Sequence, residues 1–188
     1  MSDDALKEKV LDSALVFEGN FLKVYRDTVR APDGHQGTRE YLRHPGAAMI
    51  VPMLDDERVL LERQYRHALA RSFVEFPAGK LDAGESALAC AQRELFEETG
   101  YRAAQWIYLG GFHNAIGYCD EKIEVYLARG LSSAAQARPD AGEVLELFAA
   151  PWRELLSWTR NGRVTDVKTI VGVQWLRDWW AQQAGVGL

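Results

Sequence analysis

Three glutamates lie close together in the segment GKLDAGESALACAQRELFEETGY, residues 79–101. At about 100° per residue on an α-helix, Glu94, Glu97 and Glu98 share one face. Like charges at this spacing repel one another unless a cation lies between them. Carboxylate oxygens are the ligands that Mg²⁺ and Mn²⁺ prefer, so the cluster is typical of a site for a divalent cation.

Glutamate clusters on a helix are more often a solvated acidic surface, and the neighbouring residues distinguish the two interpretations. Here the segment fits the pattern Gly, five residues, Glu, seven residues, Arg-Glu-apolar-any-Glu-Glu-any-Gly-bulky, whose chance occurrence is on the order of one in a million. The segment resembles the box that defines the Nudix hydrolases, with Tyr101 where that family usually carries a bulky aliphatic residue. The matching positions are Gly79, Glu85, Arg93, Glu94, Leu95, Glu97, Glu98, Gly100 and Tyr101.

This resemblance implies an α/β/α sandwich with a mixed β-sheet, and hydrolysis of a nucleoside diphosphate linked to another group. A diphosphate is an anion, so the carboxylates need Mg²⁺, or Mn²⁺ in its place, between them and the substrate. The ion would also make water available as a nucleophile near neutral pH. The ligands implied by the resemblance are Glu94, Glu98, Glu97 and the backbone carbonyl of Ala78.

Glu85 and Arg93 have different expected roles. We expect Glu85 in the first turn of the helix, where its charge offsets the positive end of the helix dipole. At 1.5 Å per residue it would lie roughly 20 Å from Glu98, too far to share an ion. Arg93 is a candidate catalytic residue that orients the glutamates through charge-assisted hydrogen bonds, and it could reach Glu85 if the loop bends.

The segment ERQYRHALARSFVEFPAGKLDAGES, residues 62–86, resembles the ADP-ribose pyrophosphatase branch of the family. A Q-Y-R strand end and an E-x-P-A-G lead into the box recur in that branch. The resemblance implies that Arg66 contacts the diphosphate, since a guanidinium offers a forked pair of donors to phosphate oxygens. An exposed arginine at a strand end is the alternative interpretation.

The base that deprotonates the attacking water is left open by the sequence. The branch usually carries an acidic loop late in the chain, and PDAGEVLEL, residues 139–147, resembles it. Glu143 is the candidate in this loop, either as the base or as a further metal ligand. Ala141 stands where the branch usually has another acid, so Asp140 and Glu97 remain alternatives for the base.

The substrate also has alternatives. Members of the branch that act on ADP-ribose typically have a proline in a loop downstream of the box, and Ile116 occupies that place in NAIGYCDEKIEVYLA, residues 114–128. ADP-ribose is the leading substrate, and GDP-mannose or another nucleotide sugar is the alternative. A non-catalytic module that senses nucleotides would be expected to lose a box carboxylate, and every one is present.

Residues before the box could contact the nucleotide. Arg39 and Tyr41 lie on a predicted strand that, in this branch, can reach the base or ribose, often across a dimer interface. His113 precedes the loop that carries Ile116 and is a weaker candidate for substrate contact. The four histidines have no spacing typical of metal ligands.

These residues must be positioned by a mixed α/β fold. We expect strands at 13–18, 21–30, 38–44, 47–54, 58–63, 104–110 and 122–129, with a hairpin turn at Gly19-Asn20. Residues 1–44 are therefore predicted to be an antiparallel β segment at a dimer interface, and residues 45–188 the Nudix domain. Exposed strand edges in a monomer favour a homodimer.

The segment from about Ser86 to Thr99 is the first predicted helix, with Gly100 in the left-handed conformation that ends it. Leu88, Ala91 and Leu95 should form its apolar face, beside the acidic one. Two further helices are expected near 151–160 and 166–183, the second with tryptophans at helical spacing that suit packing.

Composition excludes several classes of protein. A net charge of −5 over 188 residues argues against a nucleic-acid binder, which normally carries a basic surface. Two cysteines do not make a disulfide framework, and no apolar run reaches the roughly 20 residues that span a membrane. The acidic start of the chain has no pattern of a secretory signal, so we expect a cytoplasmic protein.

Overall fold

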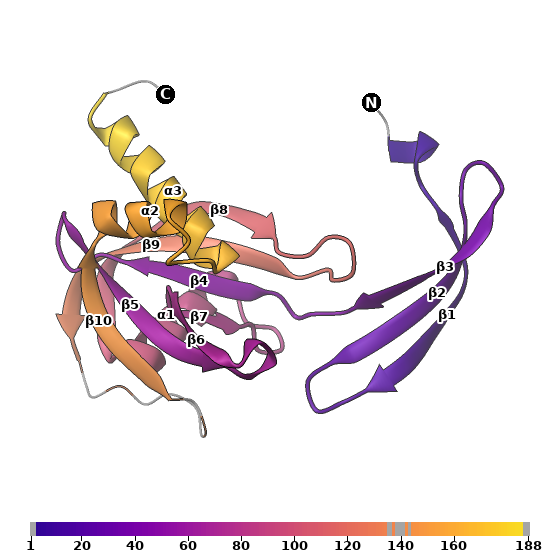
Figure 1. Ribbon diagram of the computed structural model, residues 1–188, viewed down its shortest axis with the longest axis horizontal. Coiled ribbons are helices and arrows are strands. Elements are labelled where there is room, and N and C mark those ends of the chain that lie inside the picture. The colour runs from indigo at the N-terminus through magenta and orange to yellow at the C-terminus, as the bar shows by residue number, and fades with distance from the viewer. Residues whose placement is uncertain (1–2, 135–136, 138–141, 143, 186–188) are drawn as a thin grey trace. The chain divides into compact units, whose positions relative to one another are not determined.

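The computed structural model describes residues 3–134, 137, 142 and 144–185. The chain forms two compact units, both visible in Figure 1. Unit 1 comprises Met1–Pro45 and His113–Glu121, and unit 2 comprises Gly46–Phe112 and Lys122–Leu188. The sequence did not indicate that a segment from beyond the box joins the N-terminal strands.

Unit 1 is built on an antiparallel sheet of β1 (Lys9–Glu18), β2 (Lys23–Arg30) and β3 (Gln36–Leu42), in that order. The predicted hairpin turn is confirmed, with the Gly19 amide donating to the Leu22 carbonyl at 2.8 Å. A short 3₁₀ helix, η1 (Asp3–Ala5), precedes β1. The segment 113–121 joins β3 through a bridge between Leu42 and Cys119.

Strand β1 is exposed along its whole length. Its side chains include several large apolar ones, of which Phe17 is 54% and Val10 53% exposed. Monomeric proteins rarely leave contiguous apolar surface of this kind in water. Strand β1 is therefore an apolar surface of unit 1 that the described residues leave exposed.

Unit 2 contains two sheets. The four-stranded sheet has the order β7-β4-β9-β8, with β4 and β9 parallel and β4 and β7 antiparallel, which confirms the predicted mixed sheet. The other, ordered β10-β5-β6, is antiparallel. The strands are β4 (Ala47–Pro52), β5 (Arg58–Arg66), β6 (Arg71–Glu75), β7 (Ala78–Lys80), β8 (Tyr101–His113), β9 (Lys122–Ser133) and β10 (Leu145–Pro151).

Helices cover both faces of β4, because successive side chains of a strand point to opposite faces. Ala48 and Ile50 pack in one apolar cluster with α1 (Ala87–Thr99). Met49 and Val51 belong to the other cluster, with α2 (Trp152–Arg160) and α3 (Val167–Gln183). The predicted α/β/α arrangement of this unit is confirmed, and Figure 1 shows it with α2 and α3 above β4 and β9.

The three predicted helices are all present. Helix α2 follows Pro151, its N-cap residue, and the Asp166 side chain caps α3 by accepting from the Thr169 amide at 2.9 Å. The sequence did not predict β6, β7 or the 3₁₀ turn η2 (His67–Leu69), which are all short. Within the described part of the chain, no helix combines the length and apolar character that spanning a membrane requires.

Candidate active site

Helix α1 has the boundaries that its capping residues dictate. The Ser86 hydroxyl accepts a hydrogen bond from the Ala89 amide at 3.2 Å, which satisfies one of the free amides at the helix start. Gly100 ends the helix at φ 74°, and its amide donates to the Phe96 carbonyl at 2.9 Å. Residues without a Cβ adopt this left-handed conformation at little cost, so the glycine fixes where the helix stops.

The buried stripe of α1 differs from the predicted one. Ala91 and Leu95 are fully buried as expected, but Leu88 is 37% exposed and Cys90 is buried in its place. The stripe also continues through Glu98, which is only 3% exposed. A carboxylate on an apolar stripe is costly to bury, so its presence there indicates a role other than packing.

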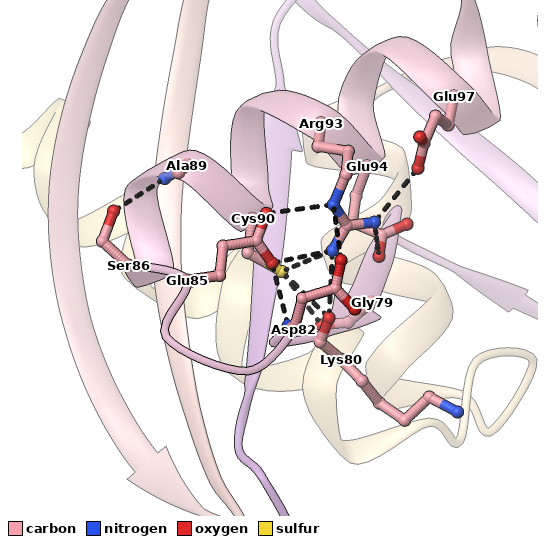
Figure 2. A network of polar contacts seen from close by, with 10 residues as sticks. All are labelled: Gly79, Lys80, Asp82, Glu85, Ser86, Ala89, Cys90, Arg93, Glu94 and Glu97. Atoms are coloured by element: carbon pink, nitrogen blue, oxygen red, sulfur yellow. Dashed lines mark hydrogen bonds and ion pairs between the residues drawn. The ribbon is translucent and has the colours of Figure 1, made fainter.

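Arg93 is the centre of a network that joins the helix to the loop before it (Figure 2). Its Nε and Nη2 donate to the two carboxylate oxygens of Glu85 at 3.0 and 2.9 Å. Its Nη1 donates to Glu94 Oε1 at 2.7 Å and to Glu97 Oε2 at 3.0 Å. The expected charge-assisted bonds are confirmed, and one guanidinium supplies the positive charge between two of the repelling glutamates.

Glu85 is not in the first turn of α1, where we expected it. The helix begins at Ala87, and Glu85 belongs to the loop that folds back to Arg93. Hydrogen bonds from Arg93, followed by one from the Asp82 amide, lower the pKa of Glu85 to about 2. Glu85 is therefore an anchor for the arginine, and the loop bend that the sequence left open is present.

The charges around Arg93 shift the pKa values of the arginine itself and of Cys90. The hydrogen bonds that Arg93 donates to Glu85 raise the pKa of the arginine further above its usual range, against the effect of burial. Burial and then the charges of Glu94 and Glu85 raise the pKa of Cys90 to about 12. The Cys90 thiol is consequently neutral and donates to the Gly79 and Lys80 carbonyls at 3.5 and 3.4 Å.

The surroundings of Gly79 explain why the box begins with a glycine. A Cβ at this position would overlap the carboxylate of Glu94. The backbone φ of Gly79 is not in the left-handed region, so the requirement comes from space alone. The backbone of β7 therefore lies directly against the carboxylate that the box resemblance assigns to metal binding.

The donor types of the box fit a divalent cation. Glu94, Glu97 and Glu98 supply carboxylate oxygens, and the absence of a Cβ at Gly79 leaves the space that the Glu94 carboxylate occupies. Within the described residues, however, no group of three or more acidic, histidine or cysteine side chains is gathered closely enough to hold an ion. Arg93 holds Glu94 and Glu97 as their counter-ion instead.

A second ionic cluster surrounds Glu75 at the end of β6. Arg66 donates from Nε and Nη2 to the two oxygens of Glu75 at 2.8 and 2.7 Å. Lys168 donates to Glu75 Oε2 at 2.6 Å and to Asp166 Oδ1 at 3.0 Å. Sequence reasoning singled out Arg66 but missed Glu75 and Lys168 as partners, although Glu75 belongs to the motif quoted for the branch.

The substrate candidates of unit 1 lie together. Arg39, Tyr41 and His113 line a cavity of about 410 Å³, and Ile116 lines it as well. Arg39 forms an ion pair with Glu8, and the Tyr41 hydroxyl donates to Asp27 Oδ2 at 3.2 Å. Residues far apart in the sequence therefore meet at this cavity. Glu143 and Asp140, the candidates for the base, lie outside the described residues.

Comparison with known proteins identifies the family. The model of the NUDIX domain matches residues 43–168, which include the box, Arg66 and Lys168. The chain belongs to the Nudix hydrolase family. A second model, the nucleoside diphosphate sugar hydrolase N-terminal domain, matches residues 8–42 of this Nudix hydrolase, the strands of unit 1.

Individual relatives resemble this Nudix hydrolase over most of their length. The ADP-ribose pyrophosphatase of Bacillus subtilis (strain 168) is 34% identical, covering 92% of this chain and 94% of that protein. The methanol dehydrogenase activator of Bacillus methanolicus is 37% identical, covering 91% and 93%. The crystal structure of an ADP compounds hydrolase has the same fold, with a TM-score of 0.86 at 23% identity over 99% of this chain and 100% of that one.

Proposed function

We propose that this Nudix hydrolase cleaves the diphosphate of ADP-ribose or a closely related nucleoside diphosphate sugar, giving a nucleoside monophosphate and a sugar phosphate. The observation that carries the proposal is the intact box, in which Arg93 bonds Glu85, Glu94 and Glu97 while Glu98 is buried on the apolar stripe. The resemblance of the whole chain to a relative named ADP-ribose pyrophosphatase supports the choice of substrate.

The cofactor in this proposal is Mg²⁺, with Mn²⁺ as the alternative. Glu94, Glu97, Glu98 and the carbonyl of Ala78 would hold it. When bound, the ion neutralises charge on the diphosphate and activates water. The chain's own contribution is to orient these oxygens. Arg93 orients the carboxylates of Glu94 and Glu97 through ion pairs, and the backbone at Gly79 lies close against the carboxylate of Glu94.

Arg66 would bind the diphosphate in this mechanism. Glu75 fixes its guanidinium through two parallel hydrogen bonds, and the Arg66 side chain is 43% exposed. A guanidinium held on one edge keeps its other donors for phosphate oxygens at little cost in entropy. Arg39 and Tyr41 would contact the base or the ribose at the cavity of unit 1.

A carboxylate oxygen would accept the proton of the attacking water, and its residue is Glu143, Asp140 or Glu97. Glu97 bonds Arg93 through Oε2. We expect Glu143→Gln to lower kcat far more than it raises KM, since a base acts on the transition state. If only KM changes, Glu143 binds substrate, and the same comparison on Asp140→Asn and Glu97→Gln assigns the base.

A homodimer is proposed as the working state, in the cytoplasm. The exposed apolar side chains of β1 support it, because a second copy would remove them from water. Light scattering should give about twice the 21.2 kDa of the chain. A species of single-chain mass at micromolar concentration would exclude the dimer.

The deciding experiment is a substrate panel with Mg²⁺. The purified protein is assayed on ADP-ribose, GDP-mannose, ADP-glucose and UDP-glucose, with product identification and with ¹⁸O water to locate the phosphorus attacked. The highest kcat/KM is expected for ADP-ribose. A higher value for GDP-mannose would replace the substrate, whereas calorimetric binding without hydrolysis of any compound would indicate a nucleotide-sensing module.

A further inference from the structure

The cluster around Glu75 contains a lysine that the proposed function does not use. Lys168 comes from the first turn of α3 and meets Glu75 at the end of β6, three residues before Ala78. We infer that Lys168 is a positioning residue for substrate binding, which shares the charge of Glu75 and so leaves the positive charge of Arg66 available to the diphosphate. This inference rests on the proposed function.

Glu75 is almost completely enclosed, with a side chain that is 3% exposed. Its Oε1 accepts from Arg66, and its Oε2 accepts from both Arg66 Nη2 at 2.7 Å and Lys168 Nζ at 2.6 Å. A buried carboxylate is tolerated only when cations and hydrogen bonds satisfy it. Two cations therefore divide one negative charge.

The geometry of Arg66 leaves part of its guanidinium for a ligand. Nε and Nη2 are used by Glu75, and among the described residues Nη1 has no hydrogen-bond partner. An arginine pairs readily with phosphate oxygens when several of its donors point the same way. Glu75 thus fixes one edge of the group and leaves the opposite edge to an anion.

The charges around Arg66 show what Lys168 adds. Three acids influence the guanidinium, namely Glu75, the buried Glu62 opposite it in the β5–β6 pairing, and Asp166. Without Lys168, Arg66 would be the one cation that the described residues show hydrogen-bonded to Glu75. Glu75 would then offset more of the positive charge that Arg66 presents to a diphosphate, because Coulomb interactions are weakly screened near buried groups.

The protonation of both partners agrees with this arrangement. Burial opposes the charge of Glu75, but the hydrogen bonds from Arg66 and the charge of Lys168 outweigh it, so the pKa of Glu75 lies below its usual range. Burial likewise opposes the charge of Lys168, and Asp166 and Glu75 outweigh it and raise the pKa of the lysine. Both groups are charged at neutral pH.

Another hydrogen bond attaches α3 to Phe76, the residue after β6, so the lysine is not needed for that contact. The Thr169 hydroxyl accepts from the Phe76 amide at 3.0 Å and donates to Asp166 Oδ2 at 2.8 Å. The Asp166 side chain also caps the helix. Lys168→Met keeps the length of the aliphatic stem and all of these bonds, and it is therefore expected to fold.

The test compares kcat and KM for ADP-ribose in wild type, Lys168→Met and Lys168→Arg. We expect Lys168→Met to raise KM about 5- to 20-fold with kcat within about 3-fold, since the lost effect acts on anion binding. Lys168→Arg, which keeps the charge, should restore most of the affinity. The matched control is Arg177→Met, which removes a cation paired with Asp178 further along the same helix and should leave KM unchanged.

A double-mutant cycle with Arg66→Ala distinguishes positioning from a merely structural role. If Lys168 acts through Arg66, Lys168→Met should change kcat/KM by less than about 2-fold in the Arg66→Ala background. The same loss in both backgrounds would overturn the inference while leaving the proposed function in place. A wild-type protein that hydrolyses no nucleotide sugar would overturn the proposed function and this inference with it.

Discussion

The two ionic clusters of unit 2 are built in opposite ways. At Arg93 one cation bonds three glutamates, and at Glu75 one carboxylate bonds two cations. The first arrangement has an excess of carboxylate oxygens, which suits a metal ion, and the second leaves arginine donors for an anion. A metal-dependent diphosphate hydrolase needs both kinds of surface, and the sign of the excess charge distinguishes them.

The largest effect is expected at the acidic cluster, from Glu98→Gln. We expect kcat to fall by about two to three orders of magnitude, because the buried carboxylate is assigned to the metal and the amide is a weaker ligand. Steady-state assays over a range of Mg²⁺ concentrations measure the loss. Glu154→Gln, at an exposed acid of α2, is the matched control, and near wild-type turnover in Glu98→Gln would remove the residue from the site.

Breaking the other cluster should affect stability. Glu75→Gln leaves Arg66 and Lys168 without their shared carboxylate, so we expect the free energy of unfolding to fall by about 2–4 kcal/mol. Urea titration measures this. In the control Glu146→Gln, the exposed ion pair with Arg63 is lost, and the change should stay below about 1 kcal/mol. Equal losses in the two variants would show that burial of Glu75 adds nothing.

The close approach at the acidic cluster can be tested with Gly79→Ala. The added Cβ would displace the carboxylate of Glu94, whose side chain can move, so we expect kcat/KM to drop about 10- to 100-fold. The free energy of unfolding should change little, since no backbone strain arises. A variant with full activity would contradict the assigned position of Glu94.

The smallest effect is expected from Glu85→Gln, and it should depend on pH. The folded pKa of Glu85 is about 2, below its unfolded value of about 4.3, so its contribution is complete above pH 4.3 and is lost as pH falls toward 2. Near pH 6 the variant should melt about 2–4 °C below wild type. The gap should narrow between about pH 4 and about pH 2, and a constant gap would contradict the shifted pKa.

Local features were predictable from the sequence, because they depend on neighbouring residues. Ser86 and Gly100 determine the ends of α1, and the spacing of Glu94, Glu97 and Glu98 places them near one another. The prediction of the buried stripe of α1 was less accurate, since periodicity alone did not indicate that Cys90 faces the carbonyls of Gly79 and Lys80. These carbonyls belong to β7, which packs beside the helix, and only the fold brings the two together.

Long-range partners could not be predicted in the same way. Glu75 and Lys168 are 93 positions apart, and no pattern in either segment points to the other. Strands β6 and β7 are short, with five and three residues, so the alternation of apolar and polar side chains repeats too few times to be recognised. The resemblance to a family led us to expect that Arg66 contacts the diphosphate, but the carboxylate that it pairs with became visible only in the structure.

The separation of Glu75 from Lys168 has a consequence during synthesis on the ribosome. Arg66 precedes Glu75 by nine positions, whereas Lys168 follows 93 positions later, which is about 5–20 s of translation. Until then Glu75 has only Arg66 of its two cationic partners. Both ion pairs of this cluster can therefore form only once α3 has emerged, and a chain that stops before residue 168 would lack the one from Lys168.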